Sequence, residues 1–171
     1  MNQFVFCPTC ASKLLEEERG GAMRMVCPDA TCGFVHWNNP IPVVGAIVEH
    51  PEGIVLVQSI GWPAHFFGLV TGFLEQIETP AEAALREIKE EIGLSGELGE
   101  FVGFYPFRRM NQIIMVYHVK VEGEVTLDRE ELADFRIVPI DKVRPWKAGT
   151  GYALMEWLNK RGYEPEFIEL S

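Results

Sequence analysis

Three glutamates lie within five residues of one another near the middle of the chain. Glu87, Glu90 and Glu91 follow Arg86 in the stretch REIKEE. If this stretch is helical, with about 100° per residue, the three carboxylates share a sector of about 100°, and Glu87 and Glu91 lie on successive turns. Like charges at this spacing repel each other by roughly 0.2–0.5 kcal/mol per pair, but carboxylate oxygens are also the ligands that hard divalent cations prefer. The stretch is therefore either a solvated charged face or a site for Mg²⁺ or Mn²⁺.

An apolar stripe adjoins this acidic sector on the same helix. Counted from Glu87 it falls between about 100° and 160°, and it consists of Ala81, Leu85, Ile88 and Ile92. We expect the stripe to pack against a sheet, with the carboxylates at its border. In a helix whose charged face is only solvated, we would expect lysines one turn away from the glutamates, where they form favourable pairs. Here Lys89 points away from the acidic sector, which argues against the solvated-face interpretation.

The four cysteines of the chain form a second group with metal-ligand spacing. They occur as C-x2-C and C-x4-C, separated by sixteen residues: Cys7, Cys10, Cys27 and Cys32. Two tight turns that each carry a pair of thiolates are typical of a tetrahedral structural zinc site. Pro8 and Pro28 follow the first cysteine of each pair and favour those turns.

Two other interpretations of this cysteine segment are open. Two disulfides would suit a secreted module, but the chain begins without a basic and then apolar export signal. A nucleic-acid-binding ribbon would need a basic surface, and between positions 7 and 39 there are three basic and four acidic residues. The sequence therefore favours zinc, in a structural rather than a catalytic role.

The overall composition limits the classes of function. The chain has 171 residues, of which 47% are hydrophobic, enough for one domain with a small appendage. Its formal net charge of −10 argues against binding to duplex DNA or RNA through a basic face. No apolar run is long enough to span a bilayer. We expect a cytoplasmic protein with a small-molecule partner, and neither a DNA nor a membrane partner.

The stretch NNPIP, which begins at Asn38, contains two prolines and two asparagines and suits neither the interior of a helix nor that of a strand. We therefore expect it to link two parts of the chain. We expect a zinc ribbon over residues 1–38 and a larger domain over 39–171. Strands are predicted over 43–50 and 53–60, short extended pieces over 66–75, strands over 96–107 and 111–123, a polar loop over 128–135 and a strand over 136–140. Helices are predicted over 80–92 and 150–160. This order favours an α/β fold in which helices cover two sides of a mixed sheet.

The acidic helix also lies inside a longer pattern, G-x5-E-x7-R-E-U-x-E-E-x-G-U, where U is aliphatic. Every fixed position is filled, by Gly72, Glu78, Arg86, Glu87, Ile88, Glu90, Glu91, Gly93 and Leu94. This pattern resembles the box of the Nudix hydrolases. The cysteine ribbon, the NNP stretch and the box together resemble two subgroups, the NADH pyrophosphatase-like group and a group that includes ADP-ribose and FAD pyrophosphatases.

The resemblance implies a fold and a set of roles. The fold is an α/β/α sandwich in which the box forms a loop, a helix and a loop. Glu87, Glu90 and Glu91 are implied as ligands of Mg²⁺ or Mn²⁺, joined by the Gly72 carbonyl, and Arg86 and Glu78 as an ion pair that braces the loop. A further glutamate from a later loop is implied, with Glu131 the best match and its neighbour Glu130 the alternative. One of Glu87, Glu90, Glu91 or Glu131 is the expected base.

The chain departs from these relatives at positions that bear on the substrate. NADH-selective members carry S-Q-P-W-P-F-P-x-S after the box, of which only Tyr105-Pro106-Phe107 is matched, and NQIIMVYHVKV is more similar to the ADP-ribose/FAD subgroup. Within the box, Ile77 stands where a glycine is usual, and Thr71 replaces a frequent Pro or Ala.

Aromatic and basic residues on either side of the box are candidate substrate contacts. Base stacking and phosphate binding are assigned to Phe104, Tyr105, Arg108 and Arg109, with a strand end packed in the core as the alternative. For Trp62, His65, Phe66 and Phe67 we favour packing, with a place in the substrate pocket as the alternative.

The expected function is metal-dependent hydrolysis of the pyrophosphate bond in a nucleoside diphosphate linked to another moiety, giving two monophosphates. ADP-ribose, FAD and NADH are the substrate types considered. The alternatives are a non-catalytic nucleotide sensor of the same fold and removal of a dinucleotide cap from RNA. Relatives that carry such a ribbon are often homodimers, so the resemblance implies a homodimer here as well.

Overall fold

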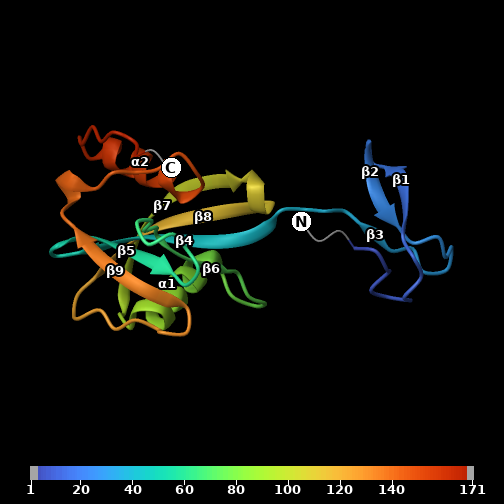
Figure 1. Cartoon of the computed structure of the whole chain (residues 1–171), viewed down its shortest axis with the longest axis horizontal. Helices are drawn as coiled ribbons and strands as arrows, with labels where there is room; N and C mark the ends of the chain where they lie inside the picture. Colours follow the sequence, from blue (N-terminus) through green and yellow to red (C-terminus); the bar gives the residue numbers. More distant parts are fainter. Residues whose placement is uncertain (1–3, 169–171) are drawn as a thin grey trace. The chain divides into compact units, whose positions relative to one another are not determined.

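A computed structural model describes residues 4–168 of the chain. The chain divides into two compact units that meet between Pro40 and Ile41. Figure 1 shows the helices and strands of each unit. No described helix is both long and apolar enough to cross a membrane.

The first unit is a small ribbon built on three short antiparallel strands. Strands β1 (Leu15–Arg19) and β2 (Ala22–Val26) form a hairpin, and β3 (Val35–His36) pairs with the end of β2. Glycines occupy the hairpin turn, where Gly20 and Gly21 both have positive φ angles. The core of this unit is small: Cys7, Leu14 and Cys27 form its buried cluster. A unit with so few buried apolar residues needs a further stabilising element.

The second unit contains a mixed six-stranded sheet. Its strands are β4 (Ile41–His50), β5 (Gly53–Ser59), β6 (Val70–Phe73), β7 (Gly96–Phe107), β8 (Gln112–Val121) and β9 (Leu132–Val138). Five of them follow the order β7-β8-β4-β5-β9, and β6 pairs with β4. The β4–β8 pair is parallel, whereas the other pairs are antiparallel. A short 3₁₀ turn, η1 (Arg108–Met110), links β7 to β8, and a second, η2 (Ile140–Lys142), follows β9.

Strand β8 pairs along one edge of β4, and two strands, β6 and β5, share the other edge. The first half of β4, from Val43 to Ala46, pairs with β6, whereas its last residues, from Val48 to His50, pair with β5. Strand β6 is therefore a short strand inserted beside the centre of the sheet, and Gly72 lies on it opposite Val44.

Helix α1 (Pro80–Ile92) has the bounds expected from the sequence. Thr79 caps its N-terminus in a capping box with Glu82, and Pro80 occupies the first turn. Gly93 ends the helix with φ 74°, and its N–H donates to the Lys89 carbonyl. These caps fix the start and the end of the helix. The face that packs against the sheet contains the buried residues Ala83, Ala84, Ile88 and Ile92.

The sheet lies between two helical layers, with α1 on one face and α2 (Thr150–Lys160) on the other (Figure 1). The alternation of side chains along the strands separates two cores. Ile54 and Leu56 of β5 pack in the cluster that contains Trp157 of α2, whereas Val55 and Val57 pack in the cluster that contains Ile88 of α1. The expected α/β/α sandwich with a mixed sheet is therefore confirmed, as is the helix predicted over 150–160.

One secondary-structure expectation is wrong. The segment 128–135 was predicted to be a polar loop, but β9 already begins at Leu132, which is 1% exposed. The segment forms a strand despite its polar sequence because it pairs with β5. The pairing contains a register shift between Gln58 and Ser59. Tertiary pairing therefore outweighs the local sequence pattern at this edge.

Tyr105 of β7 is turned toward α2. Its side chain is 9% exposed, and its hydroxyl donates a hydrogen bond of 2.7 Å to Glu156. Burial, followed by the bond to Glu156, raises the pKa of Tyr105. We infer that this side chain anchors α2 to the sheet.

We predict that Tyr105→Phe lowers the free energy of unfolding by about 1 kcal/mol, because one hydrogen bond to a partly exposed carboxylate is lost while the ring stays packed. Urea unfolding followed by tryptophan fluorescence measures this change. Catalytic parameters equal to those of the wild type would support the structural role. A KM raised several-fold at unchanged stability would instead assign Tyr105 to the substrate pocket.

Candidate functional site

The guanidinium of Arg86 is the centre of the site. Its Nε and Nη2 donate to the two carboxylate oxygens of Glu78, at 3.0 and 2.8 Å, and Nη2 also donates to the Phe73 carbonyl at 3.0 Å. Nη1 donates to Glu87 and to Glu90, both at 2.8 Å. All five N–H groups of the guanidinium therefore have an acceptor. Arg86 thus joins the loop before α1, the end of β6 and the acidic face of the helix.

Glu78 is held as a carboxylate by this pairing. The hydrogen bonds from Arg86 lower the pKa of Glu78 to about 2, helped by the backbone N–H of Glu75. The residue before it, Ile77, is fully exposed and has a φ of 63°. For a β-branched residue this left-handed conformation costs about 1–2 kcal/mol, and no burial of the side chain offsets the cost. The glycine usual at this position would adopt the same conformation without strain.

Glu87 is in close contact with β6. A Cβ added to Gly72 would lie 1.8 Å from the carboxyl carbon of Glu87, so any side chain at position 72 would displace this carboxylate. Burial raises the pKa of Glu87, and the hydrogen bond from Arg86 together with its positive charge opposes that shift. The requirement for glycine in the box therefore has a direct steric cause, the approach of Glu87 to the backbone of β6.

Glu91 is more deeply buried than the helical wheel predicted. Its side chain lies one turn after Glu87 and is 6% exposed, and its Oε2 is buried without a hydrogen-bond partner among the described residues. Burial, together with the nearby charges of Glu87 and Glu131, raises the pKa of Glu91 to about 8. An unpaired carboxylate in such a position is costly, and a bound cation would remove that cost.

The loop after β8 brings two more carboxylates to this cluster. The backbone N–H of Asp128 donates to the Glu91 carbonyl at 2.9 Å, and the Ile60 N–H donates to the Glu131 carbonyl at 2.8 Å. The charges of Asp128 and Glu131 both contribute to the raised pKa of Glu91. The charge of Glu131 thus acts on Glu91, and its role as the further glutamate of the site stays a prediction. Asp128 was missed, although its position at the start of the acidic run DREE is a signal that could have found it.

These carboxylates fit a site for divalent cations. Oxygen donors come from α1, from the loop before β9 and from β6, and they are of the kind that Mg²⁺ and Mn²⁺ accept. Among the described residues, however, only the four cysteines form a group of three or more possible metal ligands whose ligand atoms lie within 4.8 Å of one another. The unpartnered Oε2 of Glu91 is the observation in favour of that fit. Glu90 is the most exposed of the three helical glutamates, and it bonds to Arg86.

The four cysteines converge in the first unit. Their sulfur atoms all lie within 4.8 Å of one another, with Cys7 and Cys32 at 3.6 Å and Cys10 and Cys27 at 3.4 Å. Four sulfurs around one zinc ion, each about 2.3 Å from it, would be about 3.8 Å apart. A hydrogen bond with Ser12 lowers the pKa of Cys10 to about 6, and burial raises that of Cys27 to about 12. The group could hold one zinc ion.

The residues expected to contact substrate do not gather at the carboxylates. Phe104 is 63% exposed on β7, and Arg108 and Arg109 lie exposed in η1. Strand β7 is an edge of the sheet, separated from β6 by β8 and β4. Tyr105 is buried against α2, as described above. The substrate role of these four residues stays a prediction.

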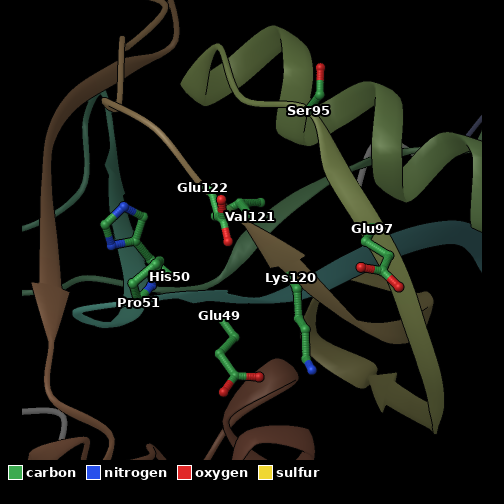
Figure 2. Close-up of a pocket in the computed structure, with 8 residues that line it drawn as sticks. All are labelled: Glu49, His50, Pro51, Ser95, Glu97, Lys120, Val121 and Glu122. Atoms are coloured by element: carbon green, nitrogen blue, oxygen red, sulfur yellow. The ribbon is translucent and has the colours of Figure 1, made fainter.

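A separate pocket lies where β4 and β8 end (Figure 2). Side chains of Glu49, Glu97, Lys120 and Glu122 are among those that line it. Glu49 lies five residues beyond Val44, the partner of Gly72, or about 17 Å along the strand. This pocket is therefore distinct from the carboxylate site, and none of the site residues expected from the sequence lines it.

Comparison with known proteins places the chain among relatives of the same domain type. The model of the NUDIX domain matches residues 39–158. The NAD-capped RNA hydrolase NudC of Stutzerimonas stutzeri is 24% identical over 144 residues, which cover 84% of this chain and 51% of that protein. The human NAD-capped RNA hydrolase NUDT12 is 30% identical over 144 residues, covering 79% of this chain and 31% of that protein. The chain spans about half the length of the NudC relatives it matches and less of NUDT12.

Solved structures agree on the fold. A NUDIX hydrolase from Nitrosomonas europaea superposes with a TM-score of 0.77 at 23% identity, covering 96% of this chain and 99% of that one. An ADP-ribose pyrophosphatase from Streptococcus suis gives a TM-score of 0.59 at 19% identity, covering 76% and 100%. The complete box, the sandwich that carries it and the domain match over residues 39–158 lead to one conclusion: the chain belongs to the Nudix family.

Proposed function

We propose that this chain is a metal-dependent pyrophosphohydrolase. Its substrate would be a nucleoside diphosphate linked to a second moiety, of the ADP-ribose, FAD or NADH type, and its products two monophosphates. One observation carries the proposal: Glu91 is buried beside Glu87 with a carboxylate oxygen that has no partner among the described residues. A non-catalytic sensor of the same fold would not need to retain every carboxylate of the box.

We assign two roles to the residues of the site: some would bind the divalent cations, and one would accept a proton from water. Glu87, Glu90 and Glu91, with the Gly72 carbonyl, would hold Mg²⁺ or Mn²⁺. When bound, such ions neutralise the diphosphate and lower the pKa of water. We favour Glu131 as the proton acceptor, because its side chain is exposed whereas Arg86 engages both Glu87 and Glu90. The water oxygen then bonds to one phosphorus as the bond from that phosphorus to the bridging oxygen breaks.

A hydrolysis panel tests this function. ADP-ribose, NADH, NAD, FAD, diadenosine polyphosphates and nucleoside triphosphates are each incubated with the chain and Mg²⁺ or Mn²⁺. We expect at least one dinucleotide-type substrate to be cleaved, and Glu87→Gln to lower kcat about 100-fold or more, because one oxygen ligand of the cation is removed.

The matched control is Glu97→Gln, which neutralises a glutamate in the separate pocket and should leave kcat unchanged. Two results would contradict the proposal. One is full activity in excess chelator, and the other is a Glu87→Gln variant as active as the wild type.

Removal of a dinucleotide cap from RNA is the second candidate. It rests on the similarity to relatives named NAD-capped RNA hydrolases, and the bond broken would be of the same type. The net charge of −10 disfavours long RNA contacts. Comparing kcat/KM for a capped RNA and for the free dinucleotide decides between the two. We further propose a cytoplasmic homodimer that does not bind DNA, with light scattering as the test of the dimer.

We also propose that the four cysteines hold one structural zinc ion. Elemental analysis should find about one zinc per chain, and Cys27→Ser should lose it, because a three-sulfur site binds zinc more weakly. Ser12→Ala, which removes a hydroxyl beside Cys10 and no sulfur, should keep the zinc. Two disulfides with no zinc would refute this assignment.

Glu91 predicts a particular dependence of stability on pH. The folded protein without added divalent ions keeps the Glu91 proton to about pH 8, whereas the unfolded chain loses it near the ordinary value of 4.5. The unfolded state therefore binds fewer protons between these values, and this group lowers the stability as the pH rises through them.

Glu91→Gln removes this penalty. Without added divalent ions we expect the variant to exceed the wild type in unfolding free energy by several kcal/mol at pH 8.5, and the difference to become small near pH 4.5. Urea unfolding followed by the tryptophans of the second unit measures it, with Glu97→Gln as control. A variant that gains nothing at pH 8.5 would show that the Glu91 carboxylate is already compensated.

A further inference from the structure

The segment that joins β8 to β9 carries Glu131, and it is attached to the last turn of α1. The N–H of Thr126 donates to the carbonyl of Ile92 at 3.0 Å, and the N–H of Asp128 donates to the carbonyl of Glu91 at 2.9 Å. Carbonyls in the last turn of a helix have no partner within that helix. The segment therefore supplies donors to two of these carbonyls, and one of the two belongs to Glu91 itself.

Asp128 takes part in this attachment through its N–H, its side chain and its carbonyl. Besides the bond from its N–H, its Oδ1 accepts the N–H of Glu130 at 2.8 Å, and its carbonyl accepts the N–H of Leu132 at 2.9 Å. An aspartate side chain that accepts the N–H two residues later closes an Asx turn. Residues 128–132 therefore form a closed turn whose first residue is bonded to α1.

The backbone of Glu131 is also held from the side of β5. The N–H of Ile60, the residue after β5, donates to the Glu131 carbonyl at 2.8 Å. Leu132, the residue after Glu131, is 1% exposed and begins β9. The position of Glu131 is therefore fixed on both sides, and the charge of its exposed side chain acts on both Glu87 and Glu91.

The carboxylate of Asp128 has two effects that substitutions can separate. One is the hydrogen bond to Glu130, which needs an acceptor on a short side chain. The other is the negative charge, which acts on Glu91. Asparagine keeps the acceptor without the charge, whereas glutamate keeps the charge on a side chain that is one methylene longer. These two variants therefore distinguish the hydrogen bond from the charge.

We propose that Asp128 is a positioning residue for Glu131. Its hydrogen bond to the N–H of Glu130 closes the turn, and the closed turn sets the charge of Glu131 beside the carboxylates of α1. The inference rests on the proposed function in one respect, since it takes Glu131 as the proton acceptor. That the Asp128 side chain holds Glu131 in place is a geometric statement, and it is tested without any substrate.

Amide hydrogen exchange of the full chain, followed by NMR without substrate, Mg²⁺ or Mn²⁺, tests the geometric statement. The N–H of Ile60 reports on the position of Glu131, because it donates to the carbonyl of that residue. We expect exchange at Ile60 and Leu132 to become about tenfold faster in Asp128→Ala and Asp128→Glu, since the loss of one hydrogen bond shifts a local opening equilibrium by roughly this factor. Asp128→Asn should stay within about threefold of the wild type.

Steady-state kinetics at saturating Mn²⁺, with a dinucleotide that the hydrolysis panel shows to be cleaved, test the effect on the reaction. We expect Asp128→Ala and Asp128→Glu to lower kcat about tenfold and to change KM less than about twofold, because the proton acceptor is displaced while the substrate site is kept. Asp128→Asn should retain kcat to within about threefold. In a Glu131→Gln background, Asp128→Ala should lower kcat no further, since the two residues act as a unit.

The matched control is Asp134→Ala. It removes a carboxylate that also accepts a backbone N–H, from Phe135, but within β9. This variant should leave both kcat and the exchange at Ile60 unchanged. Circular dichroism checks the folding of each variant, and Asp128→Glu provides the test if Asp128→Ala fails to fold.

Three results would overturn the inference. The first is unchanged exchange at Ile60 in the folded Asp128→Ala and Asp128→Glu variants. The second is an active Asp128→Glu beside an inactive Asp128→Asn, which would assign the effect to the charge. The third is a further tenfold loss of kcat when Asp128→Ala is added to Glu131→Gln. If exchange responds as expected but the wild type hydrolyses no dinucleotide, the proposed function fails while the positioning of Glu131 stands.

Discussion

The pairing of Arg86 with Glu78 and the acidic face of α1 is the interaction on which the site depends. The guanidinium has five donors, and the structure gives each of them an acceptor on the box loop, on β6 or on α1. Lysine could not replace it, because an ammonium group lacks the planar fork that binds Glu78 through two oxygens. Without this cation, the repulsion between Glu87, Glu90 and Glu91 would act against the helix.

The guanidinium of Arg86 pairs with Glu78, Glu87 and Glu90 but not with Glu91. The cost of burying an unpaired carboxylate therefore remains at Glu91. Burial and neighbouring carboxylates raise its pKa to about 8, and one of its oxygens has no partner among residues 4–168. The backbone also stores strain at Ile77. A protein selected only for stability would avoid both features. Their presence within one sequence motif, residues 72–94, fits a site where stability has been exchanged for binding.

Much of this arrangement can be predicted from the sequence, and the failures have physical causes. The helix over 80–92 is predictable because its caps and its apolar stripe are local features. The depth of Glu91 is not, because it depends on how close the loop before β9 comes to α1. The start of β9 and the orientation of Tyr105 toward α2 depend on pairing and packing partners that are distant in the chain. Asp128 joins the cluster for the same reason.

We infer that the buried carboxylates of α1 form a cation site. Calorimetric titration of Mn²⁺ into the wild type and into Glu91→Gln tests it most directly, at pH 7.5 and in two buffers that differ in ionisation enthalpy. We expect the wild type to bind Mn²⁺ and to release protons on binding, and the variant to bind at least tenfold more weakly with reduced proton release. Equal affinity and equal proton release in the two proteins would contradict it.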